Sequence, residues 1–136
     1  LTLVAAPLEQ HLFRRPVSST EQIIGAIVGL AGVALIWWSF RSLGRNFRVF
    51  AAPRRSGALI TAGLYSVVRH PMYTGVVMSL AGYVIAWGGV FSWIPCLACA
   101  AFYVVKGVKE EQLLAAKYPE YDDYRKNTWR FIPFVH

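Results

Sequence analysis

The run Arg69-His70-Pro71-Met72-Tyr73 holds the residue types best suited to chemistry in this chain. Proline is favoured in the first turn of a helix, so Arg69 and His70 are expected at a helix N-terminus. Unpaired backbone N–H groups and the positive end of the helix dipole gather there and favour a carboxylate or a phosphate. A basic anchor at a membrane surface uses the same residue types, and that interpretation stays open beside an anion site.

A second candidate group is acidic. Lys106 and Glu110 are four residues apart, so they share a helix face and can pair. Adjacent residues on a helix point about 100° apart. We therefore expect one of Glu110 and Glu111 to face inward and the other to face water. An acid near the end of a membrane helix is costly unless it is paired, hydrated or bound to something positive. The inward acid would suit a cationic small molecule, and a solvated helix end is the alternative.

The C-terminal segment is aromatic. Tyrosines recur every three residues at positions 118, 121 and 124, and the run Trp129-Arg130-Phe131-Ile132-Pro133 follows. An aromatic stripe at this spacing is typical of a segment that packs against another surface. Alternatively, the segment could press the tail against the cytoplasmic face and close a site.

The elements that must position these residues are apolar. Of the 136 residues, 56% are hydrophobic and 15% are charged, whereas a soluble domain carries about 25% charged residues. Disorder is excluded, and a soluble enzyme is disfavoured. Gln22–Phe40 is 19 residues long without a charge. As a helix it would span roughly 28 Å, which matches the hydrocarbon core of a bilayer. We predict a transmembrane helix there, with Trp37 and Trp38 at the interface.

A second uncharged stretch, Met72–Val105, is 34 residues long and exceeds one membrane span. Gly88, Gly89 and Pro95 mark a break near its middle. We predict a helical hairpin with limbs at about 72–88 and 93–108. The predicted fold class is therefore all-α integral membrane: a transmembrane helix plus a helical hairpin, with a connector over 41–71 and a C-terminal tail.

The basic residues are distributed unevenly along the chain. Twelve of the 14 Lys and Arg residues lie in the 41–71 connector or after the hairpin, and Arg14 and Arg15 precede the first span. The positive-inside rule places the connector and the tail together in the cytoplasm. The net charge of +7 then favours an anionic membrane surface as partner, and no nucleic acid is expected.

The length of the chain predicts one domain over 1–136. Pro7 and Pro16 interrupt its apolar start, and we interpret residues 1–20 either as the remnant of an upstream helix or as an interfacial segment. Cys96 and Cys99 form a C-x-x-C pair without a second pair or a nearby His. We expect packing residues there and no metal site. The oligomeric state is not indicated.

Together, these motifs resemble the isoprenylcysteine carboxyl methyltransferase family, whose wider group includes membrane phospholipid N-methyltransferases. Arg69-His70-Pro71-x-Tyr73-x-Gly75 is the most specific piece. The other matching pieces are, in chain order, Leu43-Gly44-Arg45-x-Phe47, Leu59-Ile60-Thr61-x-Gly63-x-Tyr65, Glu110-Glu111 with Leu113 downstream, Tyr121-x-x-Tyr124 and Arg130-x-x-Pro133. The resemblance covers about residues 37–134.

The resemblance implies an integral membrane enzyme that holds S-adenosyl-L-methionine at the cytosolic face and methylates a lipophilic acceptor in the bilayer. It implies a catalytic group of Arg69, His70 and Glu110. The cofactor-binding residues that it implies are Leu59, Ile60, Tyr65, His70, Pro71, Tyr73, Gly75, Glu110 and Glu111. Lys106 would lie near the acceptor, where the family often has an Arg with bidentate geometry. Gly57 and Leu64 depart from a His and a Pro that are common in the family.

The sequence also allows other functions. The chain could be a phospholipid N-methyltransferase, a non-catalytic membrane assembly module, or a membrane reductase of the sterol type with a nicotinamide cofactor. Prenylcysteine, a phospholipid amine and a small thiol are all open as acceptors.

Overall fold

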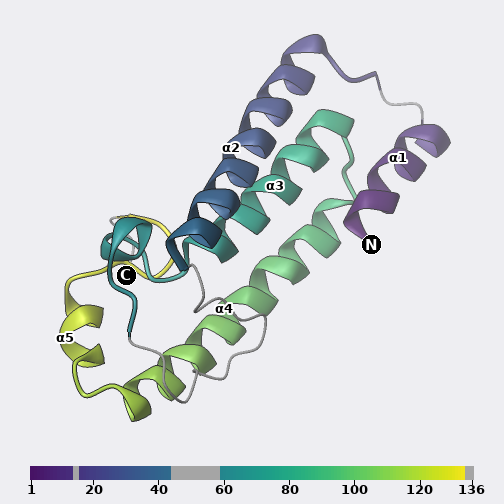
Figure 1. Ribbon diagram of the computed structural model, residues 1–136. Coiled ribbons are helices and arrows are strands. Elements are labelled where there is room, and N and C mark those ends of the chain that lie inside the picture. Colours follow the sequence, from purple (N-terminus) through teal and green to yellow (C-terminus); the bar gives the residue numbers. More distant parts are fainter. Residues whose placement is uncertain (14–15, 44–58, 134–136) are drawn as a thin grey trace.

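The computed structural model describes residues 1–13, 16–43 and 59–133, and over these residues the fold is all-α. The helices are α1 (Thr2–Phe13), α2 (Ser19–Leu43), the short 3-10 helix η2 (Gly63–Ser66), α3 (Pro71–Trp87), α4 (Trp93–Lys117) and α5 (Tyr121–Lys126). Figure 1 shows their arrangement. Several residues used in the sequence argument lie outside the described residues: Arg14, Arg15, Gly44, Arg45, Phe47, Arg48, Arg54, Arg55 and Gly57.

Helix α2 contains the predicted transmembrane segment and extends beyond it at both ends. A capping box defines its start, because the Glu21 N–H donates to Ser18 Oγ at 3.1 Å and the Ser18 N–H donates to Glu21 Oε2 at 2.9 Å. Within the described part of the chain, α2 is the one helix long and apolar enough to cross a membrane. Only 17% of its apolar window is buried. A core helix of a soluble protein would be mostly covered, so this surface favours lipid as its environment.

Helix α3 lies along α2, and glycines form the contact between them (Figure 1). A Cβ added at Gly32 would come 2.6 Å from the Gly75 carbonyl oxygen, and one at Gly75 would come 2.8 Å from the Gly32 carbonyl oxygen. A Cβ at Gly82 would collide with the backbone of Gly25 and Gly29. Small residues at such positions let two apolar helices approach closely, which is the usual source of helix association in lipid.

Helices α3 and α4 follow one another through the turn at residues 88–92, close to the predicted break. Gly88 ends α3 in the left-handed conformation, with φ 63°, which favours glycine as the C-terminal cap. The two helices then diverge, because α3 packs mainly on α2 (Figure 1). Helix α4 continues to Lys117, nine residues beyond the predicted end of the return limb at 108.

The apolar start of the chain forms helix α1, which continues through Pro7. The expected interruption at Pro7 is therefore wrong. Proline has no N–H to donate to the carbonyl four residues earlier. That carbonyl belongs to Leu3, and it accepts a hydrogen bond from the Tyr83 hydroxyl at 2.9 Å instead. A side chain from α3 thus replaces the missing helical hydrogen bond.

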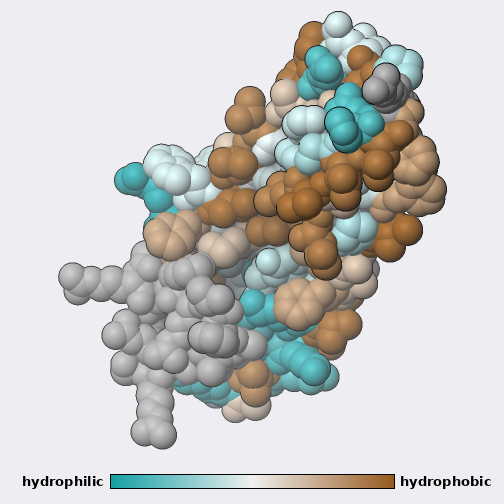
Figure 2. Space-filling view, turned by 90° about the vertical axis from the view of Figure 1, so that its right-hand side faces the viewer, coloured by the Kyte–Doolittle hydropathy of each residue, from teal (hydrophilic) through white to brown (hydrophobic). Residues whose placement is uncertain are grey.

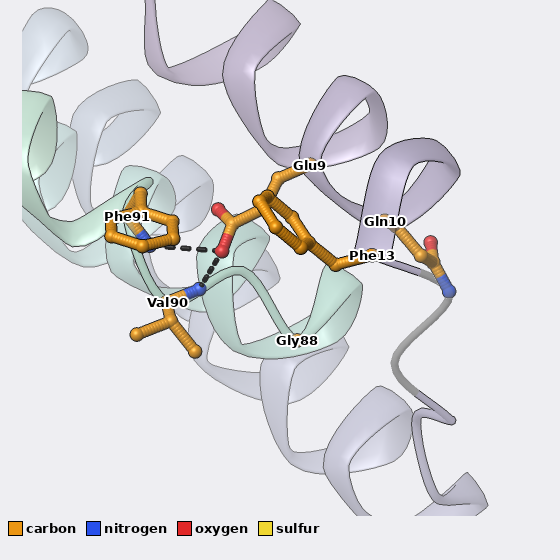
Figure 3. Close-up of a pocket in the computed structure, with 6 residues that line it drawn as sticks. All are labelled: Glu9, Gln10, Phe13, Gly88, Val90 and Phe91. Carbon is orange, nitrogen blue, oxygen red and sulfur yellow. Dashed lines mark hydrogen bonds between the residues drawn. The ribbon is translucent and has the colours of Figure 1, made fainter.

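Glu9 attaches α1 to the start of α4. Its carboxylate accepts hydrogen bonds from the N–H groups of Val90 at 2.6 Å, Phe91 at 2.9 Å and Ser92 at 3.1 Å, and from Ser92 Oγ at 2.9 Å. Val90 and Phe91 belong to the turn before α4, and Ser92 is its N-cap residue. The carboxylate therefore fixes this turn and lies at the helix start, where a negative charge is favourable. Phe13 and Phe91 lie beside it (Figure 3). The small open pocket drawn in Figure 3 is thus lined by residues around the contact of Glu9 with the turn before α4.

Apolar side chains cover much of the outer surface of α2 and α4. The exposed ones include Ile23, Ile27, Leu30, Val33, Ile94, Leu97, Phe102 and Val105. On the face drawn in Figure 2, hydrophobic residues gather along the middle of the molecule and hydrophilic residues lie toward its two ends. This distribution matches an apolar band between two aqueous phases.

Candidate functional site

The C-terminal tail pairs with the segment before α3. The Trp129 N–H donates to the Val67 carbonyl at 2.9 Å, and the N–H groups of Arg69 and His70 donate to the carbonyls of Trp129 and Arg130 at 2.8 and 3.0 Å. This short parallel pairing is centred on Val68 and Trp129. It fixes the tail beside the N-terminus of α3, so the aromatic segment packs against the body of this chain.

Glu111 is the centre of a buried ion cluster. Its Oε1 atom accepts from Arg69 Nε at 2.9 Å and from Arg130 Nε at 3.2 Å, and it lies 3.2 Å from His70 Nε2. Its Oε2 atom accepts from Arg130 Nη2 at 3.0 Å. The residue is 4% exposed. One carboxylate from α4 therefore joins the start of α3 to the tail.

The environment of Glu111 decides its ionisation. Burial alone would raise the pKa of this carboxyl group, but hydrogen bonds from His70, Arg130 and Arg69 outweigh burial and lower the pKa from 4.5 to about 2. Glu111 is consequently a carboxylate at neutral pH, and its negative charge is needed to balance the surrounding cations.

Arg69 contacts the protein through Nε and Nη1. Its guanidinium group donates to Glu111 and, through Nη1, to the Arg125 carbonyl at 2.9 Å, to Thr128 Oγ1 at 3.3 Å and to the Thr128 carbonyl. The residue is 8% exposed. Arg69 therefore holds the tail in place through donors on Nε and Nη1 that are directed at protein oxygens.

Glu110 lies on the more open side of the same cluster. Its Oε2 atom accepts a hydrogen bond from the Tyr73 hydroxyl at 2.6 Å and lies 3.8 Å from His70 Nδ1. Its side chain is 17% exposed. Among the described contacts it makes one hydrogen bond, whereas Glu111 makes four. Glu110 thus has acceptor capacity left for a ligand.

The expectation that one acid faces inward and the other faces water is wrong. His70 approaches Glu111 through Nε2 and Glu110 through Nδ1, so a single imidazole ring lies between the two carboxylates. Although adjacent positions on α4 point in different directions, the two nitrogen atoms of one imidazole ring reach both carboxylates. Both acids therefore belong to one site.

Aromatic rings line the site next to Glu110. The His70 and Tyr73 rings stack with centroids 5.3 Å apart and planes 5° apart, and the Tyr103 ring lies 4.7 Å from that of Tyr73. Phe131 from the tail lies 5.4 Å from His70. The Lys106 ammonium group is 5.0 Å from the centroid of the Tyr73 ring. The rings therefore form a stacked row that lies beside the Glu110 carboxylate.

The other residues that the sequence placed in the site lie before α3, at its start or at its contact with α2. Tyr65 is buried, and burial together with the charges of Tyr124 and Glu110 raises the pKa of its hydroxyl group. Pro71 is buried as the first residue of α3. Leu59 and Ile60 are half-buried just before η2. Gly75 faces α2 and serves the contact between helices.

Sequence reasoning did not assign a role to several residues that build the site. Arg130 and Thr128 complete the ion cluster, and Tyr103 completes the row of rings. Gly107 is buried, and a Cβ there would lie 3.1 Å from Phe131 Cζ and 3.3 Å from His70 Nε2. The spacing of 103, 107, 110 and 111 along one face of α4 is the signal that could have grouped them.

Comparison with known proteins identifies the class of protein that this fold and site define. The sequence profile of the phospholipid methyltransferase family matches residues 20–121, which include nearly all of α2, all of α3 and α4, and the site residues that these helices carry. The chain belongs to this family of methyltransferases. The resemblance inferred from the motifs is confirmed.

Three curated relatives are similar to this chain in sequence. The chain is 32% identical over 108 residues to the nickel-cobalt-cadmium resistance protein NccN of Alcaligenes xylosoxydans xylosoxydans, covering 78% of this chain and 48% of that protein. It is 28% identical over 108 residues to the cobalt-zinc-cadmium resistance protein CzcN of Cupriavidus metallidurans, with the same coverages. It is 31% identical over 121 residues to a protein-S-isoprenylcysteine O-methyltransferase of Dictyostelium discoideum, covering 83% and 49%. The chain spans about half the length of these relatives.

Proposed function

We propose that this chain is an integral membrane methyltransferase that uses S-adenosyl-L-methionine to methylate a lipophilic acceptor. Membership of the phospholipid methyltransferase family supports the reaction class. The observation that carries the proposal is the direct contact of Arg69 and His70 with the acids of α4 at one end of the molecule. Segments separated by about 40 residues meet there.

The residues of the site fit the cationic groups of this cofactor. S-adenosyl-L-methionine carries a sulfonium, an ammonium and a carboxylate, so it needs both an acid and apolar walls. Glu110 offers carboxylate oxygens beside the aromatic rings of Tyr73 and His70. Glu111 is saturated by its own cluster. We therefore assign the cofactor-facing acid to Glu110 and a positioning role to Glu111 and Arg69.

Methyl transfer depends chiefly on alignment and on exclusion of water. When bound, the cofactor supplies a methyl group that passes to a lone pair of the acceptor while the electrons of the broken S–C bond return to sulfur, leaving S-adenosylhomocysteine. Glu110 and the start of α3 would orient the donor. Phe131 and the paired tail would cover it, because Thr74 Oγ1 donates to the Phe131 carbonyl at 2.8 Å and holds that residue over the site.

The orientation proposed is with the 41–71 connector and the tail in the cytoplasm. Twelve of the 14 basic residues belong to these segments, and the positive-inside rule supports this placement. The site then lies at the cytoplasmic membrane surface, where a water-soluble cofactor and a bilayer-resident acceptor can both arrive. Lys106 lies on the α4 face that borders the site and is proposed to contact the acceptor.

The acceptor class is proposed only as lipophilic. One relative is named for isoprenylcysteine, and the family is named for phospholipids. Prenylcysteine and a phospholipid amine therefore remain the two leading acceptors. A non-catalytic assembly module is the competing function, and it predicts no methyl transfer at all.

The test is transfer of a radiolabelled methyl group from S-adenosyl-L-methionine into a whole lipid extract, with the purified chain in detergent. We expect a labelled lipid with the wild-type chain and at least tenfold less with Glu110→Gln. Glu120→Gln, an exposed acid on the tail, is the matched control and should retain transfer. Absence of labelled product with the wild-type chain, together with no cofactor binding, would favour the non-catalytic module.

A further inference from the structure

The ammonium group of Lys106 lies beside the aromatic rings of the candidate site. Its ammonium group lies 5.0 Å from the centroid of Tyr73 and 6.0 Å from that of Tyr103. These distances are within the range of cation–π attraction. Both rings belong to the row that borders Glu110. The site therefore already attracts a positive charge without any ligand.

A sulfonium has recognition needs that these groups meet. It carries a full positive charge but no proton, so no acceptor can hydrogen-bond to it. The faces of aromatic rings and a nearby carboxylate are the groups that attract such a cation. Tyr73 is held in place by its hydrogen bond to Glu110 at 2.6 Å and by stacking on His70. The π surface is consequently rigid and has a carboxylate at its edge.

We propose that Tyr73 and Tyr103 form the recognition site for the sulfonium, and that Lys106 holds this site as a resident cation until the cofactor displaces it. The inference rests on the proposed function. Two positive charges cannot share the same ring faces without strong repulsion, so cofactor binding moves the ammonium group away. The displaced Lys106 then becomes available to an anionic group of the acceptor. This assigns to Tyr103 a specificity role that neither the motif nor the family match provides.

The experiment compares binding of S-adenosyl-L-methionine and S-adenosylhomocysteine to the full chain in detergent by calorimetry. The two ligands differ by one methyl group and by the sulfonium charge. Their affinity ratio therefore reports recognition of the charge. We expect the wild-type chain to bind the sulfonium ligand several-fold more tightly than the thioether.

Two variants with matched controls separate the contributions. Lys106→Met keeps the apolar stem and should tighten S-adenosyl-L-methionine binding by about threefold to tenfold while leaving the thioether unchanged. Lys109→Met removes the same charge from an exposed position on α4 and should change neither affinity. Tyr103→Leu should lower the affinity ratio by about fivefold, and Tyr103→Phe, which keeps the ring face, should preserve it.

The outcomes distinguish this inference from the proposed function. If both ligands bind but Lys106→Met weakens or does not alter sulfonium binding, the resident-cation proposal is overturned and the methyltransferase proposal stands. Equal losses for both ligands in Tyr103→Leu would show that the ring is only a wall of the site. If neither ligand binds the wild-type chain, both proposals fail. Should Tyr103→Leu not fold, the pair Lys106→Met and Lys109→Met decides alone.

Discussion

At the residue scale, the two adjacent acids of α4 have different tasks. Glu111 is buried among Arg69, His70 and Arg130, whereas Glu110 contacts Tyr73 at the open side. The family resemblance grouped Arg69, His70 and Glu110 in one site, and the charge pattern predicted that the connector and the tail lie on one side of the membrane. The different contacts of the two acids could not be predicted. They depend on backbone pairing of the tail, which brings Arg130 next to Glu111 on α4.

The role of Glu111 predicts a large loss of stability in Glu111→Ala. The substitution leaves buried cations without their counter-charge, and breaking a buried ion pair in this way typically costs about 3–5 kcal/mol. Thermal unfolding in detergent measures the loss. Glu110→Gln should unfold within a few degrees of the wild-type chain, and an equally stable Glu111→Ala would contradict the structural role.

The lowered pKa of Glu111 predicts a pH dependence of stability. A carboxyl group whose folded-state pKa lies below its unfolded value stabilises the fold above the unfolded value, and that contribution disappears as the pH falls through the folded-state pKa. With a shift from 4.5 to about 2, about 3 kcal/mol should be lost progressively below pH 4.5. Unfolding followed from pH 6 to pH 3 should show a steeper decline for the wild-type chain than for Glu111→Gln. Parallel curves would rule out this linkage.

At the element scale, the lengths of the uncharged runs and the positions of charged residues predicted helices α2, α3 and α4. Most of the predicted helix ends lie within three residues of the observed ends. The end of α4 was placed too early, because charged residues from Lys106 onward indicated the membrane surface. A helix needs no bilayer to continue, since its backbone hydrogen bonds are internal. The extension to Lys117 brings Glu110 and Glu111 to the start of α3. For residues 1–20 the sequence left a helix and an interfacial segment open, because the Tyr83 hydrogen bond that compensates Pro7 within α1 comes from a distant element.

The glycine contact between α2 and α3 predicts an asymmetric response to added methyl groups. Gly82→Ala would place a Cβ against the backbone of Gly25 and Gly29, which cannot yield without separating the helices. We expect a loss of about 2 kcal/mol or more. In Gly29→Ala the nearest atom lies 3.8 Å from the new Cβ, an ordinary contact. Because alanine also favours the helix by about 1 kcal/mol over glycine, this variant should be neutral or more stable.

Thermal unfolding of the two glycine variants side by side provides the measurement. The comparison is informative because both substitutions add the same methyl group to the same pair of helices. Equal stabilities of Gly82→Ala and Gly29→Ala would mean that α2 and α3 are not packed as described.

At the scale of the whole molecule, the structure has two distinct ends with an apolar surface between them (Figure 2). One end carries the ion cluster, the tail and the site. The other carries the Glu9 cap on the start of α4 (Figure 3). The sequence could predict this polarity, because basic residues and long uncharged runs are local features. It could not predict that α3 pairs with α2 and diverges from α4, since that choice depends on glycines matching across helices.

This polarity predicts which ends are reachable from each side of a membrane. In a background of Cys96→Ser and Cys99→Ser, single cysteines replace the exposed residues Asp123 on α5 and His11 on α1. A membrane-impermeant thiol reagent should label Asp123→Cys only in inside-out vesicles and His11→Cys only in right-side-out vesicles. Labelling of both positions from the same side would contradict a transmembrane arrangement.

The central claim is that Glu110, at the junction of α3, α4 and the tail, binds the cationic part of a methyl donor. The most direct measurement is calorimetric titration of S-adenosyl-L-methionine into the purified chain, compared with Glu110→Gln and with the exposed control Glu120→Gln. The account predicts binding by the wild-type chain and by Glu120→Gln, and at least tenfold weaker binding by Glu110→Gln. Unchanged affinity in a folded Glu110→Gln variant would contradict it.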